Sequence, residues 1–181
     1  SGHKIYAPKG IGGLFIKNSS TISPIFYGGG QENGIRSGTL NVPGIVGISK
    51  ACEIYSLTHQ KEYTELESLR NFFENTLLNF NNKIHINGLN ACRLPNISNI
   101  SFPVKDGFNL MNILSDKKMI ACSSGSACDA SDNKPSHVMK ELGKTRHEAK
   151  NTLRFSFGRF TTKNEVIQGC NHIIQLIKNA I

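Results

Sequence analysis

The sequence contains no tryptophan, and aromatic residues make up only 8 % of its 181 positions. Proteins that bind single-stranded nucleic acid stack bases on aromatic side chains, so this scarcity argues against that class of function. No apolar run approaches the roughly 20 residues that a membrane-spanning helix needs, and no secretory signal is visible. Because the chain starts at Ser1 without a methionine, we expect it to have been cut from a longer protein.

Cysteine is present, but not in a pattern typical of a disulfide framework or of a structural zinc site. The number of cysteines is odd, and no C-x-x-C pair occurs. The five cysteines are Cys52, Cys92, Cys122, Cys128 and Cys170. We therefore expect no metal site. A reducing compartment is expected, either a bacterial cytoplasm or an organelle matrix such as that of mitochondria, and not secretion. Cys52 and Cys170 lie in helical patterns typical of small buried residues, whereas Cys128 does not.

Positive charge exceeds negative charge. There are 21 Lys and Arg residues against 13 Asp and Glu residues, a net charge of +8. This excess favours phosphate or carboxylate ligands and acidic protein surfaces. The basic residues are scattered and not gathered into a stripe, so we expect neither nucleic acid nor a membrane as a partner.

Residue periodicity predicts three parts, over residues 1–45, 46–81 and 82–181. The first contains many turn-forming glycines around a short expected strand at Leu14–Ile16. From about Pro43 to Phe80, apolar residues recur every three or four positions, which predicts one long helix or two helices joined near Thr58.

Residues 82–181 alternate short strands and helices, as is typical of a compact α+β domain. Polar and apolar residues alternate over Asn96–Phe102 and Thr152–Phe157, which predicts two half-buried strands. Further expected elements are a helix at Phe108–Leu114, a strand at Met119–Cys122, a helix at Ser136–Leu142 and a last helix capped by Thr162.

The first candidate site is Ser1-Gly2-His3-Lys4. A lysine in a pocket that lowers its pKa can form a Schiff base with a carbonyl cofactor such as pyridoxal phosphate. The neighbouring hydroxyl and imidazole groups can bind a phosphate. Taken alone, an ordinary surface lysine near a chain end explains the pattern better.

The second candidate is the glycine-rich segment Gly28–Thr39. Backbone N–H groups at glycines can approach an anion closely, and Arg36, Ser37 and Thr39 are suitable phosphate ligands. The segment is neither a Walker A loop nor a G-x-G-x-x-G motif. A solvated turn explains it about equally well.

The third candidate is the thiol of Cys128 in the segment S-S-G-S-A-C. Small polar neighbours are what an exposed, mobile nucleophile needs, whereas a buried structural cysteine normally has apolar neighbours.

The fourth candidate is Arg154 in the strand T-L-R-F-S-F. Alternation places Arg154 on one face with Ser156, opposite Leu153 and Phe155. An arginine there can hold a carboxylate through two parallel hydrogen bonds. A surface ion pair is the simpler alternative.

Together, the four motifs closely resemble the C-terminal half of the cysteine desulfurases, which are pyridoxal-phosphate enzymes of the class V aminotransferase family. The S-G-S-A-C form resembles the first desulfurase group, which serves iron–sulfur cluster assembly. The resemblance implies an α/β fold, that of fold type I pyridoxal-phosphate enzymes. This chain would then be the α+β small domain plus the last strands of the large domain.

The resemblance also implies residue roles. Lys4 would bind pyridoxal 5′-phosphate covalently, with Ser1 and His3 at its phosphate group. Thr39 would reach the cofactor of the neighbouring subunit, since the family enzymes are homodimers. Arg154 would bind the carboxylate of L-cysteine and Cys128 would accept its sulfur, and the products would be L-alanine and a persulfide. The persulfide would pass to a sulfur acceptor or an iron–sulfur scaffold protein.

Family members are much longer, and their N-terminal half supplies further cofactor ligands. We therefore expect the isolated chain to bind the cofactor poorly and to turn over little substrate. The alternative hypothesis is a truncated, catalytically incompetent chain that acts only as a docking module for partner proteins.

Overall fold

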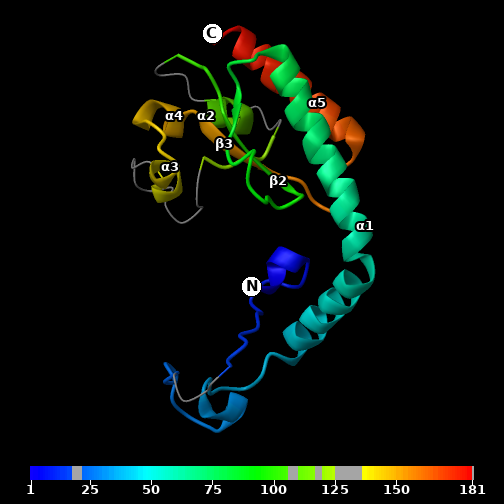
Figure 1. Cartoon of the computed structure of the whole chain (residues 1–181). Coiled ribbons are helices and arrows are strands. Elements are labelled where there is room, and N and C mark those ends of the chain that lie inside the picture. The colour runs from blue at the N-terminus through cyan, green and yellow to red at the C-terminus, as the bar shows by residue number, and fades with distance from the viewer. Residues whose placement is uncertain (18–21, 106–109, 117–119, 125–135, 181) are drawn as a thin grey trace. The chain divides into compact units, whose positions relative to one another are not determined.

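The computed structural model describes residues 1–17, 22–105, 110–116, 120–124 and 136–180. Its contacts divide the chain into two compact units, Ser1–Gln60 and Lys61–Ile181. Helix α1, Val42–Phe80, contributes residues to both units (Figure 1). Because α1 is one continuous helix, the first of the two predicted helical arrangements is confirmed.

The Ser1–Gln60 unit contains two short 3-10 helices, η1 (Gly2–Ile5) and η3 (Gln31–Gly34), besides the first part of α1. The expected strand at Leu14–Ile16 is wrong, since these residues have no strand assignment. A strand needs a neighbour that accepts its backbone hydrogen bonds. Among the described residues, the unit offers only an isolated bridge between Phe26 and Arg36.

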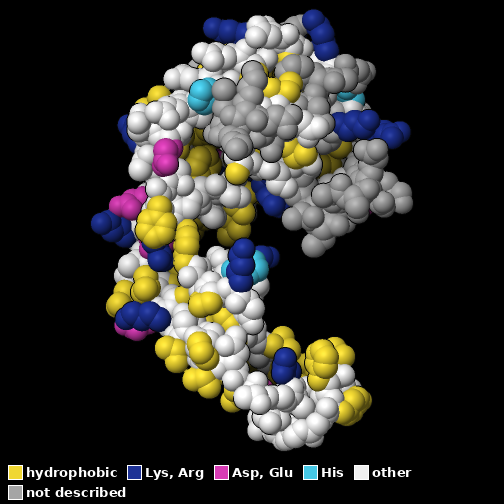
Figure 2. Space-filling view, turned by 180° about the vertical axis from the view of Figure 1, so that it is seen from behind, with side chains coloured by type: hydrophobic (Ala, Val, Ile, Leu, Met, Phe, Trp, Pro, Cys, Tyr) yellow, Lys and Arg dark blue, Asp and Glu magenta, His cyan; other side chains and the backbone are white. Residues whose placement is uncertain are grey.

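Apolar side chains stand at the surface of this unit, as Figure 2 shows. Phe15 is 88 % exposed and Ile25 is 85 % exposed. Cys52 is also exposed, so its predicted burial is wrong. Helical periodicity identifies the apolar face of α1, but burial requires a layer packed on that face, and none of the described residues covers Cys52.

Side chains near its first turn position the beginning of α1. The Asn41 Oδ1 accepts a hydrogen bond from the Gly44 N–H at 3.1 Å, which satisfies one of the first backbone donors of the helix. Gly47 lies against Pro8, because a Cβ at Gly47 would be 2.6 Å from the Pro8 Cγ. A side chain at position 47 would therefore push Pro8 away from the helix.

The Lys61–Ile181 unit contains an antiparallel sheet in the order β1 (His85–Ile86), β2 (Ile97–Ser101) and β3 (Thr152–Ser156). The two strands predicted by alternation, β2 and β3, are confirmed. Their register pairs Ser98 with Phe155 and Ile100 with Leu153. One face of the sheet consequently carries Ile100, Leu153 and Phe155, which belong to the hydrophobic core.

The core lies between that face and two helices, α1 and α5 (Lys163–Lys178) (Figure 1). Leu77 of α1, Ile100 of β2 and Ile173 of α5 are completely buried in it. The predicted cap of the last helix is confirmed as a capping box. The Thr162 N–H and hydroxyl donate to the Glu165 carboxylate at 2.7 and 2.8 Å.

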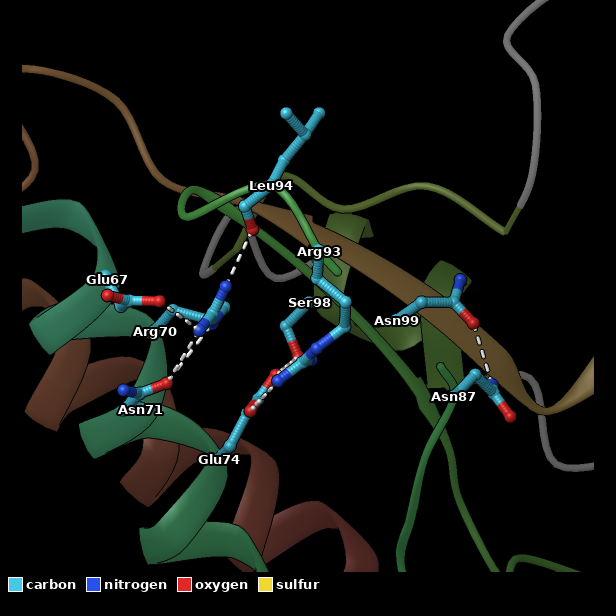
Figure 3. Close-up of polar contacts among 9 residues, drawn as sticks. All are labelled: Glu67, Arg70, Asn71, Glu74, Asn87, Arg93, Leu94, Ser98 and Asn99. Atoms are coloured by element: carbon cyan, nitrogen blue, oxygen red, sulfur yellow. Dashed lines mark hydrogen bonds and ion pairs between the residues drawn. The ribbon is translucent and has the colours of Figure 1, made fainter. Parts of the chain in front are cut away.

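A buried ion pair connects α1 to the sheet and to the segment before it (Figure 3). The Arg93 guanidinium donates to both oxygens of the Glu74 carboxylate, at 2.7 and 3.0 Å. The Ser98 hydroxyl donates to the same carboxylate at 2.6 Å. One turn earlier, Arg70 donates to the Leu94 carbonyl at 2.7 Å. These contacts hold residues 93–98 against α1.

Three short helices complete the unit, namely α2 (Leu110–Asp116), α3 (His137–Glu141) and α4 (Arg146–Lys150). The helix α4 was not predicted from the sequence. The predicted strand at Met119–Cys122 is wrong for the described residues 120–122, which have no strand assignment. Only the next residue, Ser123, pairs with β3. In the described part of the chain, no helix is long and apolar enough to cross a membrane.

Candidate functional site

The first four residues form a single turn that carries three candidate side chains. Ser1 precedes η1, and its Oγ lies 3.1 Å from the Nδ1 of His3. The Lys4 N–H donates to the Ser1 carbonyl at 3.2 Å. Lys4 is exposed. A hydroxyl, an imidazole and a primary amine are thus presented by one 3-10 turn.

Gly2 fixes this turn against the chain that follows it. The Gly2 N–H donates to the Ile11 carbonyl at 2.9 Å, and Gly2 is buried. A Cβ at Gly2 would lie 2.9 Å from that carbonyl oxygen. The close approach of the two backbones therefore requires glycine at this position.

Most residues of the glycine-rich segment are exposed, and a few local hydrogen bonds connect its two ends. The buried Ser37 donates its hydroxyl to the Gly29 carbonyl at 2.6 Å. The Gly38 N–H donates to the Gln31 side chain at 3.1 Å. Glu32 and Asn33 adopt positive φ angles of 52° and 56°. Ser37 is therefore used in holding the segment together.

Thr39, another residue predicted to contact a phosphate in this region, is exposed just before α1. Arg36 donates to the Ser37 carbonyl at 2.8 Å, and its guanidinium carbon lies 5.6 Å from the centre of the Phe26 ring. Thr39 thus belongs to the same unit as Lys4, on a different segment.

Arg154 lies in β3 on the face away from the core, as alternation predicts. Its neighbours Leu153 and Phe155 are buried in the core, whereas Arg154 is half-buried. Both of its backbone groups bond to Ser123. The Arg154 N–H donates to the Ser123 carbonyl at 2.7 Å, and the Ser123 N–H donates to the Arg154 carbonyl at 3.1 Å. The backbone of Arg154 is therefore held between β2 and Ser123.

The guanidinium of Arg154 differs from those of the other shielded arginines of this unit. Arg70, Arg93 and Arg159 each form an ion pair, with Glu67, Glu74 and Glu62. Among the described residues, none accepts a hydrogen bond from the Arg154 guanidinium. A half-buried cation without a protein anion is well suited to bind an anionic ligand.

Ser123 lies five positions before Cys128, which is itself outside the described residues. Cys122, next to Ser123, packs against the core, and burial raises the pKa of its thiol. Cys122 is therefore a poor nucleophile near neutral pH.

Of the predicted site residues, the structure brings Ser1, His3 and Lys4 together, and it places Thr39 and Arg154 on other segments. Besides Ser156, which alternation predicts on the Arg154 face of the sheet, Asn99 of the neighbouring strand lies beside Arg154 and was not predicted as a site residue. The alternation in N-I-S-N-I-S-F already placed Asn99 on that face, opposite the apolar Ile100. In the described part of the chain, no group of three or more His, Cys, Asp or Glu residues is arranged to hold a metal ion.

The sequence matches the model of the aminotransferase class-V family over residues 1–168. Among similar curated proteins is the cysteine desulfurase IscS of Dictyoglomus turgidum, which is 36 % identical over 181 residues. That match covers 100 % of this chain and 45 % of the relative. The cysteine desulfurase IscS of Klebsiella pneumoniae subsp. pneumoniae is 40 % identical over 183 residues, covering 100 % of this chain and 43 % of the relative.

Solved structures of similar proteins also superimpose on this chain. A NifS-like protein superimposes with a TM-score of 0.83 and 34 % identity, over 99 % of this chain and 45 % of that chain. The structure of SspA in complex with cysteine superimposes with a TM-score of 0.63 and 33 % identity, over 90 % of this chain and 44 % of that chain.

The curated relatives described here are named as enzymes, which gives no support to a purely docking role. The chain spans less than half of the length of these relatives. The family model, by contrast, matches almost the whole of this chain. The chain therefore belongs to the aminotransferase class-V family of pyridoxal-phosphate proteins, and its relatives within that family include cysteine desulfurases.

Proposed function

We propose that this chain is part of a cysteine desulfurase, which removes sulfur from L-cysteine with the help of pyridoxal 5′-phosphate. The observation that carries the proposal is the half-buried Arg154, whose guanidinium has no protein acceptor among the described residues. Such a group suits the carboxylate of an amino acid. The S-S-G-S-A-C segment begins at the residue whose backbone pairs with Arg154.

The residues of the first turn fit the cofactor. Ser1 and His3 supply a hydroxyl and an imidazole 3.1 Å apart, which suits a phosphate group, and Lys4 supplies an exposed amine one residue further on. Ser1 and His3 would hold the phosphate, and Lys4 would bond to the cofactor covalently. When bound, pyridoxal phosphate withdraws electrons from the substrate carbon atoms. The freed Lys4 amine would then move the substrate Cα proton.

Cys128 would receive the sulfur atom. A bond forms between the Cys128 Sγ and the substrate sulfur, and the bond between that sulfur and the substrate Cβ breaks. The thiol proton of Cys128 ends on the carbon of the product, so that L-cysteine and a thiol become L-alanine and a persulfide. No external oxidant or reductant is needed for this balance.

The persulfide sulfur would pass to an acceptor or scaffold protein for iron–sulfur cluster assembly. The net charge of +8 supports acidic partners for that transfer. We also propose a homodimer, with Thr39 at the partner's cofactor. The exposed apolar side chains of residues 1–60 support an extensive interface in that region.

We propose a reducing compartment, either the bacterial cytoplasm or an organelle matrix, as the site of action. Cys52, Cys92, Cys122 and Cys170 carry free thiols, and a transferable persulfide persists only where thiols are not oxidised to disulfides. Fractionation of cells followed by detection of the protein tests this assignment.

The experiment uses the complete natural polypeptide that contains this sequence, supplied with pyridoxal phosphate and L-cysteine. Alanine and persulfide are quantified by mass spectrometry, and cofactor binding by absorbance. We expect equal amounts of alanine and persulfide in the first turnover. Cys128→Ser should abolish the persulfide and retain cofactor binding.

Arg154→Ala tests the carboxylate site separately. We expect it to raise KM for L-cysteine by about a hundredfold, the effect of losing a charge-assisted two-bond contact. A persulfide that persists in Cys128→Ser would refute the sulfur acceptor. An unchanged KM in Arg154→Ala would refute the substrate site.

A further inference from the structure

Arg154 lies beside a chain of hydrogen-bonded polar side chains on the face of the sheet away from the core. Its direct neighbour across the sheet is Asn99 of β2. Because both backbone groups of Arg154 bond to Ser123, Arg154 and Asn99 form a pair without mutual backbone hydrogen bonds. In such antiparallel pairs the Cα atoms are only about 4.5 Å apart and the side chains are closest.

The direction of the hydrogen bonds in this chain is determined at one end. The Thr152 hydroxyl donates to the Glu148 backbone carbonyl at 2.6 Å, and a carbonyl can only accept. Thr152 has therefore used its proton and must accept from the Ser101 hydroxyl, 2.7 Å away. Ser101 in turn has used its own proton and can only accept from the next residue.

That next residue is Asn87, whose Nδ2 lies 2.9 Å from the Ser101 Oγ. Asn87 is only 6 % exposed, so its side chain has no alternative partner in solvent. The same Nδ2 also donates to the Asn99 Oδ1 at 2.7 Å. Among the described residues, the buried Asn87 Oδ1 has no hydrogen-bond partner, which is the cost of presenting the amide nitrogen to both acceptors.

Asn99 is consequently oriented with its oxygen toward Asn87 and its Nδ2 in the opposite direction. Figure 3 shows the Asn99 nitrogen pointing away from Asn87. Asn99 is half-buried, and among the described residues none accepts a hydrogen bond from its Nδ2. Two donors without protein acceptors, an amide and a guanidinium, therefore lie side by side on neighbouring strands.

We propose that Asn99 is a specificity-determining residue that donates a second hydrogen bond to the carboxylate held by Arg154. The polar chain from Glu148 to Asn87 positions the Asn99 amide as a donor. This proposal rests on the proposed function of Arg154, and it adds selection for a carboxylate over a neutral group. An amide presented with the opposite orientation would repel the anion.

The main test compares L-cysteine with cysteamine, which is the same molecule without the carboxylate, in the complete natural polypeptide loaded with cofactor. We expect Asn99→Ala to raise KM for L-cysteine about tenfold, the effect of one hydrogen bond to a charged group. The value of kcat and the apparent affinity for cysteamine should change less than about twofold.

Ser98→Ala is the matched control. It removes one side-chain hydrogen bond from the adjacent position of β2, on the opposite face, where Ser98 donates to Glu74 at 2.6 Å. We expect it to lower thermal stability at least as much as Asn99→Ala and to leave KM unchanged. Equal KM values in the two variants would overturn the proposal, because Asn99 would then have only a structural role.

Thr152→Val tests whether the hydrogen-bonded side chains between Glu148 and Asn87 orient the Asn99 amide. Valine keeps the shape of threonine but cannot accept the Ser101 proton, so Ser101 can donate to Asn87 and both amides can reverse. We expect a rise in KM for L-cysteine of the same order as in Asn99→Ala. An unchanged KM would show that this row of hydrogen bonds does not orient Asn99.

A second measurement does not depend on turnover. The side-chain amide signals of Asn99 are followed by nuclear magnetic resonance while L-alanine, which carries the carboxylate without sulfur, is added. We expect them to shift in the wild type and not in Arg154→Ala. If Arg154→Ala raises KM but the Asn99 signals never shift, this inference fails and the proposed function stands. If Arg154→Ala has no effect, the proposed function itself fails.

Discussion

The buried ion pair between Glu74 and Arg93 gives a quantitative prediction about the stability of the Lys61–Ile181 unit. The Glu74 side chain is 5 % exposed and the Arg93 side chain 17 %. The carboxylate accepts three hydrogen bonds, two from Arg93 and one from Ser98. The hydrogen bond to Glu74 raises the pKa of Arg93 above its ordinary value, so the contact favours the charged form of Arg93.

Glu74→Gln keeps the shape and removes the charge. The new amide group would place donors against the donors of Arg93 and leave that guanidinium without a counter-ion. Removing one partner of a buried ion pair costs about 3–5 kcal/mol. We take about 3 kcal/mol, because Arg93 retains some contact with water. For a domain of this size, that corresponds to a fall in melting temperature of roughly 10 °C.

The assay is urea unfolding followed by circular dichroism. Glu65→Gln is the matched control, since Glu65 lies on the same helix and forms an exposed ion pair with Lys61 at 3.8 Å. That substitution should cost less than about 1 kcal/mol. Replacing Glu74 and Arg93 together by methionine should cost less than the sum of the single changes, because no charge is left buried. A cost for Glu74→Gln no larger than that for Glu65→Gln would refute the reasoning.

Three further predictions concern single residues. Burial raises the pKa of the Cys170 thiol to about 11, so iodoacetamide should modify the exposed Cys52 rapidly and Cys170 only after unfolding; equal rates in the folded protein would contradict this. Hydrogen bonds at the helix cap hold the pKa of Glu165 below its ordinary 4.5. The ionised Glu165 therefore stabilises the protein fully above pH 4.5, and this stabilisation is lost as the pH falls through the lowered pKa. The difference in melting temperature between wild type and Glu165→Gln should therefore disappear in acid, and a constant difference would argue against the cap. Gly2→Ala should weaken pyridoxal phosphate binding, measured by absorbance, because its Cβ would lie 2.9 Å from the Ile11 carbonyl oxygen; unchanged binding would show that the turn tolerates the shift.

The elements predicted correctly are those whose stabilising contacts lie within this chain. Residues 97–101 and 152–156 pair with each other, and their alternating pattern reports that pairing directly. Thr162 caps α5 through neighbours three residues away. In both cases the local sequence and the tertiary contacts favour the same structure.

The incorrect predictions fall where a local pattern lacks a partner. Leu14–Ile16 has the composition of a strand, but among the described residues none offers it a neighbouring strand. Cys52 follows a helical repeat at a position that no described residue covers. Local propensity is a weak preference that forms a strand or a core only when other residues complete it.

The arginines show why the candidate site could be predicted only in part. Composition counts Arg93 and Arg154 as equivalent positive charges, and both lie on or beside strands of one sheet. Glu74, distant in sequence, neutralises Arg93, whereas the described residues that pair with Arg154 or flank it in its own strand, Asn99, Thr152 and Ser156, are neutral. The first arrangement stabilises the fold and the second leaves a cation available for a ligand. A buried arginine therefore indicates function only once its partners are known, and those partners are determined by register and packing, not by the motif around it.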